Sequence, residues 1–192
     1  MGKIAPSHDY IILDACCVIN LFASGKMLSI LETIPDKFAI ADYIIEKEAL
    51  AIYGGPDGDV MQTKKVIDLS PFVGNSLLTL ASPSCEDEYI DFVNFTHYLD
   101  DGEAITGAIA KYRSWGIGID EKRGISFFRR EIPQLPLLST PELIKYWADS
   151  ANPCRSLLSD VIQNIRSRAR YSPGKGHPLY QWWEDSKSSF WS

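Results

Sequence analysis

YIILDACCVIN, residues 10–20, opens with four consecutive apolar residues that stop at Asp14. A short apolar run without alternating polar residues is typical of a central parallel strand that is covered on both faces. The residues after Asp14 predict a short helix, which we expect to end near Gly25. A buried strand that leads directly into a helix is the building unit of α/β proteins, so this segment predicts that class.

The alternation of strands and helices continues along most of the chain. Three further apolar runs predict strands: 38–40, 116–119 and 135–138. Helical patterns separate or follow them: 27–34, 86–99, 100–113 and the segment from Thr140, which begins with a hydroxyl cap, a proline and an acid. This order predicts an α/β domain with a mainly parallel sheet and right-handed crossovers.

The middle of the chain has a less regular pattern. We expect Asp42 to cap a helix that runs through Ile52 and ends at Gly54-Gly55, followed by a turn at GGPDGD, residues 54–59. The runs at 65–69 and 77–80 predict an antiparallel hairpin or an addition to the sheet edge. The segment 121–130 fits neither the helical nor the strand period.

The alternation stops near residue 152. Beyond it, residues 156–169 predict one more helix, and the turn SPGKGHP leads into the aromatic tail LYQWWEDSKSSFWS. We therefore expect a domain at 1–152 and a C-terminal helical and aromatic extension at 153–192, packed on the domain or at an interface.

Composition indicates a folded globular protein, with 45% hydrophobic residues, five Trp and a net charge of -6. An acidic chain still binds nucleic acid where a basic surface or bridging metals offset the phosphate charge. Residues 1–17 lack the pattern of a secretory signal, and no apolar run reaches the roughly 20 residues of a membrane helix. We expect a soluble, cytoplasmic protein without membrane association.

The four cysteines, Cys16, Cys17, Cys85 and Cys154, form no C-x-x-C pattern. Reduced thiols in an intracellular protein are the expected state, rather than disulfides or a zinc site. The three histidines are scattered singly, which argues against a His-based metal site or catalytic triad.

Three acids are expected at one edge of the sheet. Asp14 and Asp120 each end an apolar run, and Glu103 lies in the first turn of a helix. Open α/β sheets bind ligands at the carboxyl ends of their strands. Carboxylates crowded there repel by about 4 kcal/mol per pair at 4 Å with an effective dielectric near 20, so a cation must offset them. Oxygen ligands without His or Cys suit Mg²⁺ or Mn²⁺.

Each acid also has a simpler interpretation when taken alone. Asp14 would serve equally as a cap for the following helix, and Glu103 as a first-turn acid favoured by the helix dipole. Asp120 with Glu121 fits a cap followed by a first-turn acid. The joint placement of the three acids is what favours a metal site.

The chain resembles the PIN-domain family of metal-dependent ribonucleases, which includes the VapC-type toxins. The matching segments lie within residues 10–150: IILDACCVIN, ADYIIEKEAL, YLDDGEAITGAIAKYR, GIGIDEKRG and PLLSTPELIKYWA. The resemblance implies a three-layer α/β/α sandwich and a helix at 121–130. It also implies a homodimer and, for a toxin, an antitoxin protein encoded beside it.

Residue by residue, Asp14 resembles the family's first acid, Glu103 the acid that opens the middle helix, and Asp120 the acid after the fourth strand. Asn20 takes the place of a polar residue that would orient a water or a phosphate oxygen. A further acid is expected in EKEAL, where Glu48 fits the family pattern better than Glu46. A helix turns by about 200° over two residues, so only one of the two glutamates would face the pocket.

The sequence departs from the family beside Asp120. Ile119 stands where many relatives carry a small hydroxyl residue, and Glu121 where many carry a second Asp. The resemblance implies an endoribonuclease that hydrolyses RNA with Mg²⁺ or Mn²⁺, in which Asp14, Glu103 and Asp120 hold the metal and Glu48 and Asn20 complete the catalytic set.

Because the pocket is acidic, the RNA must be bound by other residues. Lys122 and Arg123 are the first candidates. Other basic or stacking candidates are Arg129, Arg130, Arg166, Arg168, Arg170, Tyr180, Trp182, Trp183 and Trp191. Basic residues near a helix end also complement the dipole, and a Trp-rich tail also packs on its own domain or at a dimer interface.

Two other functions are consistent with parts of this pattern. A PIN-like binding or assembly module without catalysis is one, and Mn²⁺ titration distinguishes it from the nuclease. A phosphoryl-transfer enzyme of haloacid-dehalogenase or receiver type also carries an Asp after its first strand. DACCV lacks the second Asp of the former, and the paired acid and Lys of the latter are not evident.

Overall fold

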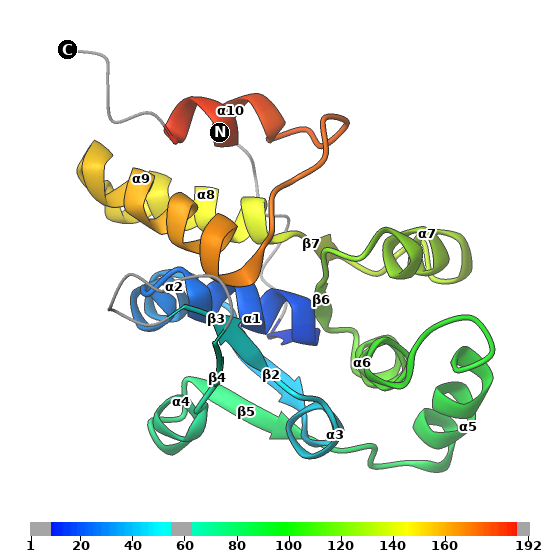
Figure 1. The fold of residues 1–192 in the computed structure, drawn as a ribbon. Helices are drawn as coiled ribbons and strands as arrows, with labels where there is room; N and C mark the ends of the chain where they lie inside the picture. The colour runs from blue at the N-terminus through cyan, green and yellow to red at the C-terminus, as the bar shows by residue number, and fades with distance from the viewer. Residues whose placement is uncertain (1–8, 55–62, 188–192) are drawn as a thin grey trace. The chain divides into compact units, whose positions relative to one another are not determined.

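The structure is a computed structural model that describes residues 9–54 and 63–187 (Figure 1). Two compact units are formed from interleaved parts of the chain. We call residues 1–18, 35–49 and 68–140 the sheet unit, and residues 19–34, 50–67 and 141–192 the helical unit. The predicted boundary at residue 152 stays a prediction.

The sheet unit contains a five-stranded sheet in which every neighbouring pair is parallel. The strand order is β5-β2-β1-β6-β7. The strands are β1 (Tyr10–Leu13), β2 (Lys37–Ala41), β5 (Leu78–Ala81), β6 (Gly116–Gly118) and β7 (Leu137–Leu138). This parallel sheet, flanked by helices, confirms the predicted α/β fold class.

The centre of the sheet is buried, as the apolar run at its first strand predicts. Ile11, Ile12 and Leu13 of β1 are 0% exposed. Helix α6 (Asp101–Arg113) contacts β1, β2 and β6, and every residue from Gly102 to Ala110 is buried. Helix α5 (Glu86–Phe95) packs along α6 (Figure 1). The core of this unit therefore lies between the sheet and α6.

Helix α7 (Lys122–Glu131) completes this part of the sheet unit. Phe128 lies so close to α6 that a Cβ at Gly107 would come within 2.2 Å of its Cε1 atom. The helical assignment confirms what the resemblance implied for residues 121–130, which the periodicity alone left open.

Of two predictions in the middle of the chain, one is wrong and the other is confirmed in one of its alternatives. Helix α3 (Asp42–Lys47) ends before Glu48, so Ile52 lies in a strand, β3 (Ala51–Tyr53), and not on a helix. Of the two alternatives for 65–69 and 77–80, the hairpin does not form, because β4 (Lys64–Val66) pairs antiparallel with β3. The addition to the sheet edge is confirmed for β5, which pairs parallel with β2 as the outermost strand. A short helix, α4 (Ser70–Gly74), lies between β4 and β5. Of the turn predicted at 54–59, residues 55–59 lie outside the described residues.

The helical unit contains β3, β4 and most of the remaining helices. They are α2 (Met27–Thr33), α9 (Arg155–Asn164), the π-helical segment η1 (Ile165–Ala169) and α10 (Tyr180–Ser186). Helices α1 (Ala15–Ala23) and α8 (Thr140–Ala151) run from the sheet unit into this one. The helix predicted at 156–169 is confirmed as α9 with η1.

Aromatic side chains of the C-terminal region contribute to the core of the helical unit. Trp183 is 0% exposed and lies edge-on to Tyr171. Trp147 is buried as well and donates a hydrogen bond to Ser29 at 3.0 Å. Arg170 stacks over the ring of Tyr53. Trp183 therefore packs inside its own chain, while Trp191 lies outside the described residues.

Among the described residues, no single helix is long and apolar enough to cross a membrane. Helices α1 and α2 meet the length and composition requirements only when taken together, and they are bent by 112°.

Candidate functional site

The sheet order creates a switch point between β1 and β6. From the central strand β1, the chain first builds β2 and β5 on one side and then returns to add β6 and β7 on the other. Leu13 and Gly118 are register partners, so the residues after them, Asp14 and Ile119, leave the sheet at the same edge. The crevice at the carboxyl ends of the strands at such a point is where open α/β sheets bind ligands.

Asp14 is fixed at this edge by its main chain and is 5% exposed. Its N–H donates to Gly118 O at 2.9 Å, and its carbonyl accepts from Val18 N–H at 3.1 Å, so it also begins α1. Burial raises the pKa of its carboxyl and the negative charge of Asp100 adds to the rise, although a 2.8 Å hydrogen bond from Cys16 Sγ opposes it. The carboxylate is thus held close to a second acid in a poorly solvated place.

Glu103 is the most deeply buried glutamate of the site, at 3% exposed. Its main-chain N–H donates at 2.8 Å to Asp100, the N-cap of α6. Its Oε1 atom is buried and has no hydrogen-bond partner among the residues that the structure describes. Burial, followed by the charges of Asp100 and Asp14, raises the pKa of this carboxyl to about 7. A buried carboxylate oxygen without a partner is costly unless a cation or a proton satisfies it.

Glu48 reaches the same place from the end of α3. Its backbone is extended, with φ -100° and ψ 140°, so Glu48 does not continue the helix to which Glu46 belongs. Glu48 is half-buried whereas Glu46 is exposed. Burial, then the charges of Asp14, Asp100 and Asp101, raises the pKa of Glu48 to about 7. The helical rotation expected between the two glutamates does not apply, because α3 ends at Lys47.

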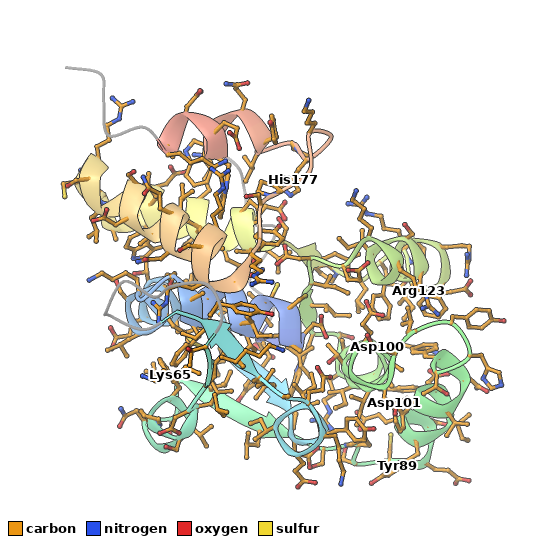
Figure 2. The ribbon with its side chains drawn as sticks, viewed as in Figure 1. Lys65, Tyr89, Asp100, Asp101, Arg123 and His177 are labelled. Atoms are coloured by element: carbon orange, nitrogen blue, oxygen red, sulfur yellow. The ribbon has the colours of Figure 1, made fainter. Side chains whose placement is uncertain are left out.

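These contacts define an acidic cluster of Asp14, Glu48, Asp100 and Glu103. Figure 2 shows Asp100 at the start of α6, next to Asp101. Two glycines leave room for the glutamates: a Cβ at Gly102 would lie 1.9 Å from Glu48 Oε1, and one at Gly124 would lie 2.6 Å from Glu103 Oε1. The local sequence thus permits a close approach of carboxylates that side chains at these two positions would obstruct.

Asp120 joins the cluster through the thiol groups at the start of α1. Its N–H lies 3.4 Å from Cys16 Sγ, which in turn donates to Asp14, and its Oδ2 accepts from Cys17 Sγ at 3.3 Å. Thr140, the first residue of α8, donates to Asp120 from its N–H at 2.9 Å and also from its hydroxyl. Asp120 therefore caps the start of α8, while the N-cap position of α7 belongs to Glu121.

The remaining predicted residues lie as follows. Asn20 is buried within α1, in the part that belongs to the helical unit. Lys122 and Arg123 are exposed in the first turn of α7, where Figure 2 shows Arg123. A cation in a first turn opposes the helix dipole, so the dipole explains Arg129 and Arg130 in the last turn but not this pair.

Four residues of the site were not predicted from the sequence in these roles: Asp100, Cys16, Cys17 and Thr140. Asp100 precedes Glu103 by three residues, which is the spacing of an N-cap and could have indicated its place. Cys16 and Cys17 follow Asp14 at the start of a helix, and only the pairing of β1 with β6 brings them to Asp120. No local signal indicates that contact.

By chemistry, the carboxylates suit a hard divalent cation, whereas the three donors that lie within 4.8 Å of one another among the described residues are Cys16, Cys17 and Asp120. The acidic cluster and Asp120 offer carboxylate oxygens only, with one of them buried and unpaired. Comparison with protein-family models, curated proteins and solved structures found no match for this chain.

Proposed function

We propose that this protein is a metal-dependent endoribonuclease of the PIN-domain type. The observation that carries the proposal is the buried Oε1 atom of Glu103, which has no partner among the described residues although Asp14 and Asp100 lie nearby. Asp14, Glu103 and Asp120 would hold Mg²⁺ or Mn²⁺, and Glu48 would complete the site.

The electrostatics of the cluster support a cation rather than a purely structural role. Glu48 and Glu103 both have a pKa of about 7, so near neutral pH each is only partly ionised when no metal is bound. A divalent cation would stabilise the ionised forms. Because each group is already partly ionised, metal binding would release few protons. A helix cap alone would need none of this crowding.

The PIN resemblance agrees with the position of each acid in the fold. Asp14 follows the central strand and Asp120 follows β6, which is the fourth of the five sheet strands in chain order. Glu103 lies in the first turn of α6. These are the places to which the resemblance assigns the family acids. The residues beside Asp120 depart from the family, but Thr140 supplies the hydroxyl group that Ile119 lacks.

The chemistry would be hydrolysis of phosphodiester bonds. A bound Mg²⁺ or Mn²⁺ lowers the pKa of a coordinated water and offsets the charge of the phosphate. Asp14, Asp120 and the two glutamates would position the cation at the sheet edge. Lys122 and Arg123, at the start of α7, would attract the phosphate backbone. Glu121, next to them, is among the charges that raise the pKa of Glu103, so this end of α7 adjoins the acidic cluster.

The biological setting is a further part of the proposal. A toxin of a toxin–antitoxin pair would act in the cytoplasm, form a homodimer and be held inactive by a small antitoxin protein. A neighbouring reading frame for such a protein supports this setting, and its absence removes the toxin assignment while leaving the nuclease proposal in place.

The direct test compares Asp14→Asn with Glu46→Gln on mixed RNA with Mn²⁺. Loss of a metal ligand should reduce cleavage by more than about 100-fold, since even residues that only support a ligand cost 10–100-fold. Glu46 is exposed and serves as the matched control. Full activity in Asp14→Asn contradicts the proposal. A wild-type chain that neither binds Mn²⁺ in calorimetry nor cleaves RNA is a PIN-like binding module instead.

A further inference from the structure

Two thiols lie beside the carboxylates, and the oxygen-ligand site does not use them. Cys16 and Cys17 occupy the first turn of α1. Their sulfur atoms and a carboxylate oxygen of Asp120 all lie within 4.8 Å of one another. Cys16 is partly exposed and Cys17 is buried, and both are free thiols. This group combines soft and hard donors, unlike the acidic cluster.

Each thiol lies within hydrogen-bonding distance of a carboxylate. Cys16 Sγ donates to Asp14 Oδ2 at 2.8 Å, and Cys17 Sγ donates to Asp120 Oδ2 at 3.3 Å. A hydrogen atom between a sulfur and a carboxylate oxygen occupies the region that a cation shared by the same two atoms would take. The two sulfur atoms and the Asp120 oxygen provide three donors that are close to one another, the number of protein ligands in an open tetrahedral zinc site.

We propose that Cys16, Cys17 and Asp120 form a three-ligand site for a thiophilic divalent cation such as Zn²⁺, with the fourth position open to water. Thiolate donors favour Zn²⁺ over Mg²⁺, which takes oxygen ligands. Thr140 donates to Asp120 from its N–H and its hydroxyl, and these two hydrogen bonds hold the carboxylate in place near the thiols.

The thiol site shares Asp120 with the proposed Mg²⁺ or Mn²⁺ site, and Cys16 also donates a hydrogen bond to Asp14. Occupation by Zn²⁺ withdraws Asp120 and ends that hydrogen bond, so Zn²⁺ inhibits the enzyme by weakening the binding of the catalytic cation. This consequence rests on the proposed function, whereas the binding of Zn²⁺ does not.

Co²⁺ titration of the full, reduced chain tests the binding. Cysteine thiolates bound to Co²⁺ give an intense near-ultraviolet charge-transfer absorption that carboxylates do not give. We expect this band in the wild type, its loss on addition of Zn²⁺, and its loss in Cys16→Ser. Cys85→Ser/Cys154→Ser, which removes the two exposed thiols, is the matched control and should keep the band.

Two outcomes overturn the thiol site: no band in the wild type, or a band that survives in Cys16→Ser and disappears in the control. Cys16 is the variant of choice because its side chain is partly exposed, and near-ultraviolet circular dichroism verifies that the variant is folded.

Parallel RNA cleavage assays keep this proposal separate from the proposed function. A Co²⁺ band in a chain that does not cleave RNA with Mn²⁺ supports the thiol site and removes the nuclease. Cleavage with Mn²⁺ in a chain without the band does the reverse. Where both hold, Zn²⁺ should raise the Mn²⁺ concentration needed for half-maximal activity, and Cys16→Ser should reduce that increase.

Discussion

The carboxylate of Glu48 occupies the space that a side chain at Gly102 would fill: a Cβ there would lie 1.9 Å from Glu48 Oε1. Glu48 follows α3 and Gly102 lies in the first turn of α6, so the contact joins two segments distant in sequence. The absence of a side chain at position 102 is what allows Glu48 to reach the acidic cluster.

Gly102→Ala should therefore weaken metal binding without unfolding the chain. The nearest atoms belong to the end of a flexible side chain, so Glu48 moves away and leaves the cluster. We expect Mn²⁺ affinity, measured by calorimetry, to fall about 10-fold, the lower end for losing a supporting group. The control is Gly74→Ala in α4, where an added Cβ would have nothing within 4 Å, and it should bind as the wild type does. Equal binding by both variants would exclude Glu48 from the site.

Thr140→Val tests whether Asp120 must be held by the hydroxyl. The substitution keeps the shape of the side chain and the main-chain N–H, which donates to Asp120 at 2.9 Å, but removes the hydroxyl donor. We expect Mn²⁺ affinity to fall by about 10-fold or more, and Thr140→Ser to restore it. If Thr140→Val binds Mn²⁺ as tightly as the wild type while Thr140→Ser binds it weakly, the methyl group rather than the hydroxyl is what matters.

Stability should depend on pH in the metal-free chain. The pKa values of Glu48 and Glu103 are raised from an ordinary 4.5 to about 7. Groups with a raised folded pKa contribute stability that is complete below about pH 4.5 and is lost as the pH rises through about 7. We expect Tm in EDTA to fall across this window and saturating Mn²⁺ to reduce the fall. Glu103→Gln should flatten the curve, whereas Glu46→Gln, at an exposed position, should not.

Glu88 and Arg113 test a structural ion pair away from the site. Glu88 is 1% exposed, and Arg113 donates to its two oxygens at 2.8 and 2.9 Å. Burial, the largest single effect, raises the pKa of Glu88, but the hydrogen bonds from Arg113 and Ser84 together with the charge of Arg113 outweigh it and lower the pKa. Arg113→Met should cost about 3 kcal/mol in urea unfolding, because it leaves a buried charge.

The control for this pair is an ion pair at the surface. Lys145→Met removes the i,i+4 pair with Asp149, whose side chain is 55% exposed, and should cost about 0.5 kcal/mol or less. Similar losses in the two variants would show that the Glu88 pair is no stronger than a surface pair.

The sequence was sufficient to predict four of the five sheet strands, β1, β2, β6 and β7, because each contains a short apolar run. Strands that are buried on both faces consist of apolar residues, so residue type alone indicates them. The pairing of β3 with β4 was missed because the residues of β3 were assigned to the helix that begins at Asp42, although a turn was predicted directly after them.

The candidate site was also predictable in part. The positions of Asp14, Glu103 and Asp120 follow from strand ends and a helix start. The contacts of Cys17 with Asp120 and of Gly102 with Glu48 depend on which strands and helices are neighbours, so they emerge only from the folded structure.

The two ends of helix α7 should differ in their contribution to RNA binding. Lys122 and Arg123 lie in its first turn, against the dipole, whereas Arg129 and Arg130 lie in its last turn. Arg130 is also paired with Glu131 at 2.6 Å. If the first-turn pair contacts two phosphates, Lys122→Ala/Arg123→Ala should make the log–log salt dependence of single-stranded RNA binding shallower by about 1.4.

Binding is measured by fluorescence anisotropy over a range of salt concentrations, with Ca²⁺ in place of Mn²⁺ to limit cleavage. The control, Arg129→Ala/Arg130→Ala, removes the same charge from the same helix and should leave the slope near that of the wild type. A slope that changes equally in both variants would indicate a general loss of positive charge. A slope that changes only in the control would place the RNA at the other end of α7 and remove Lys122 and Arg123 from the proposed binding surface.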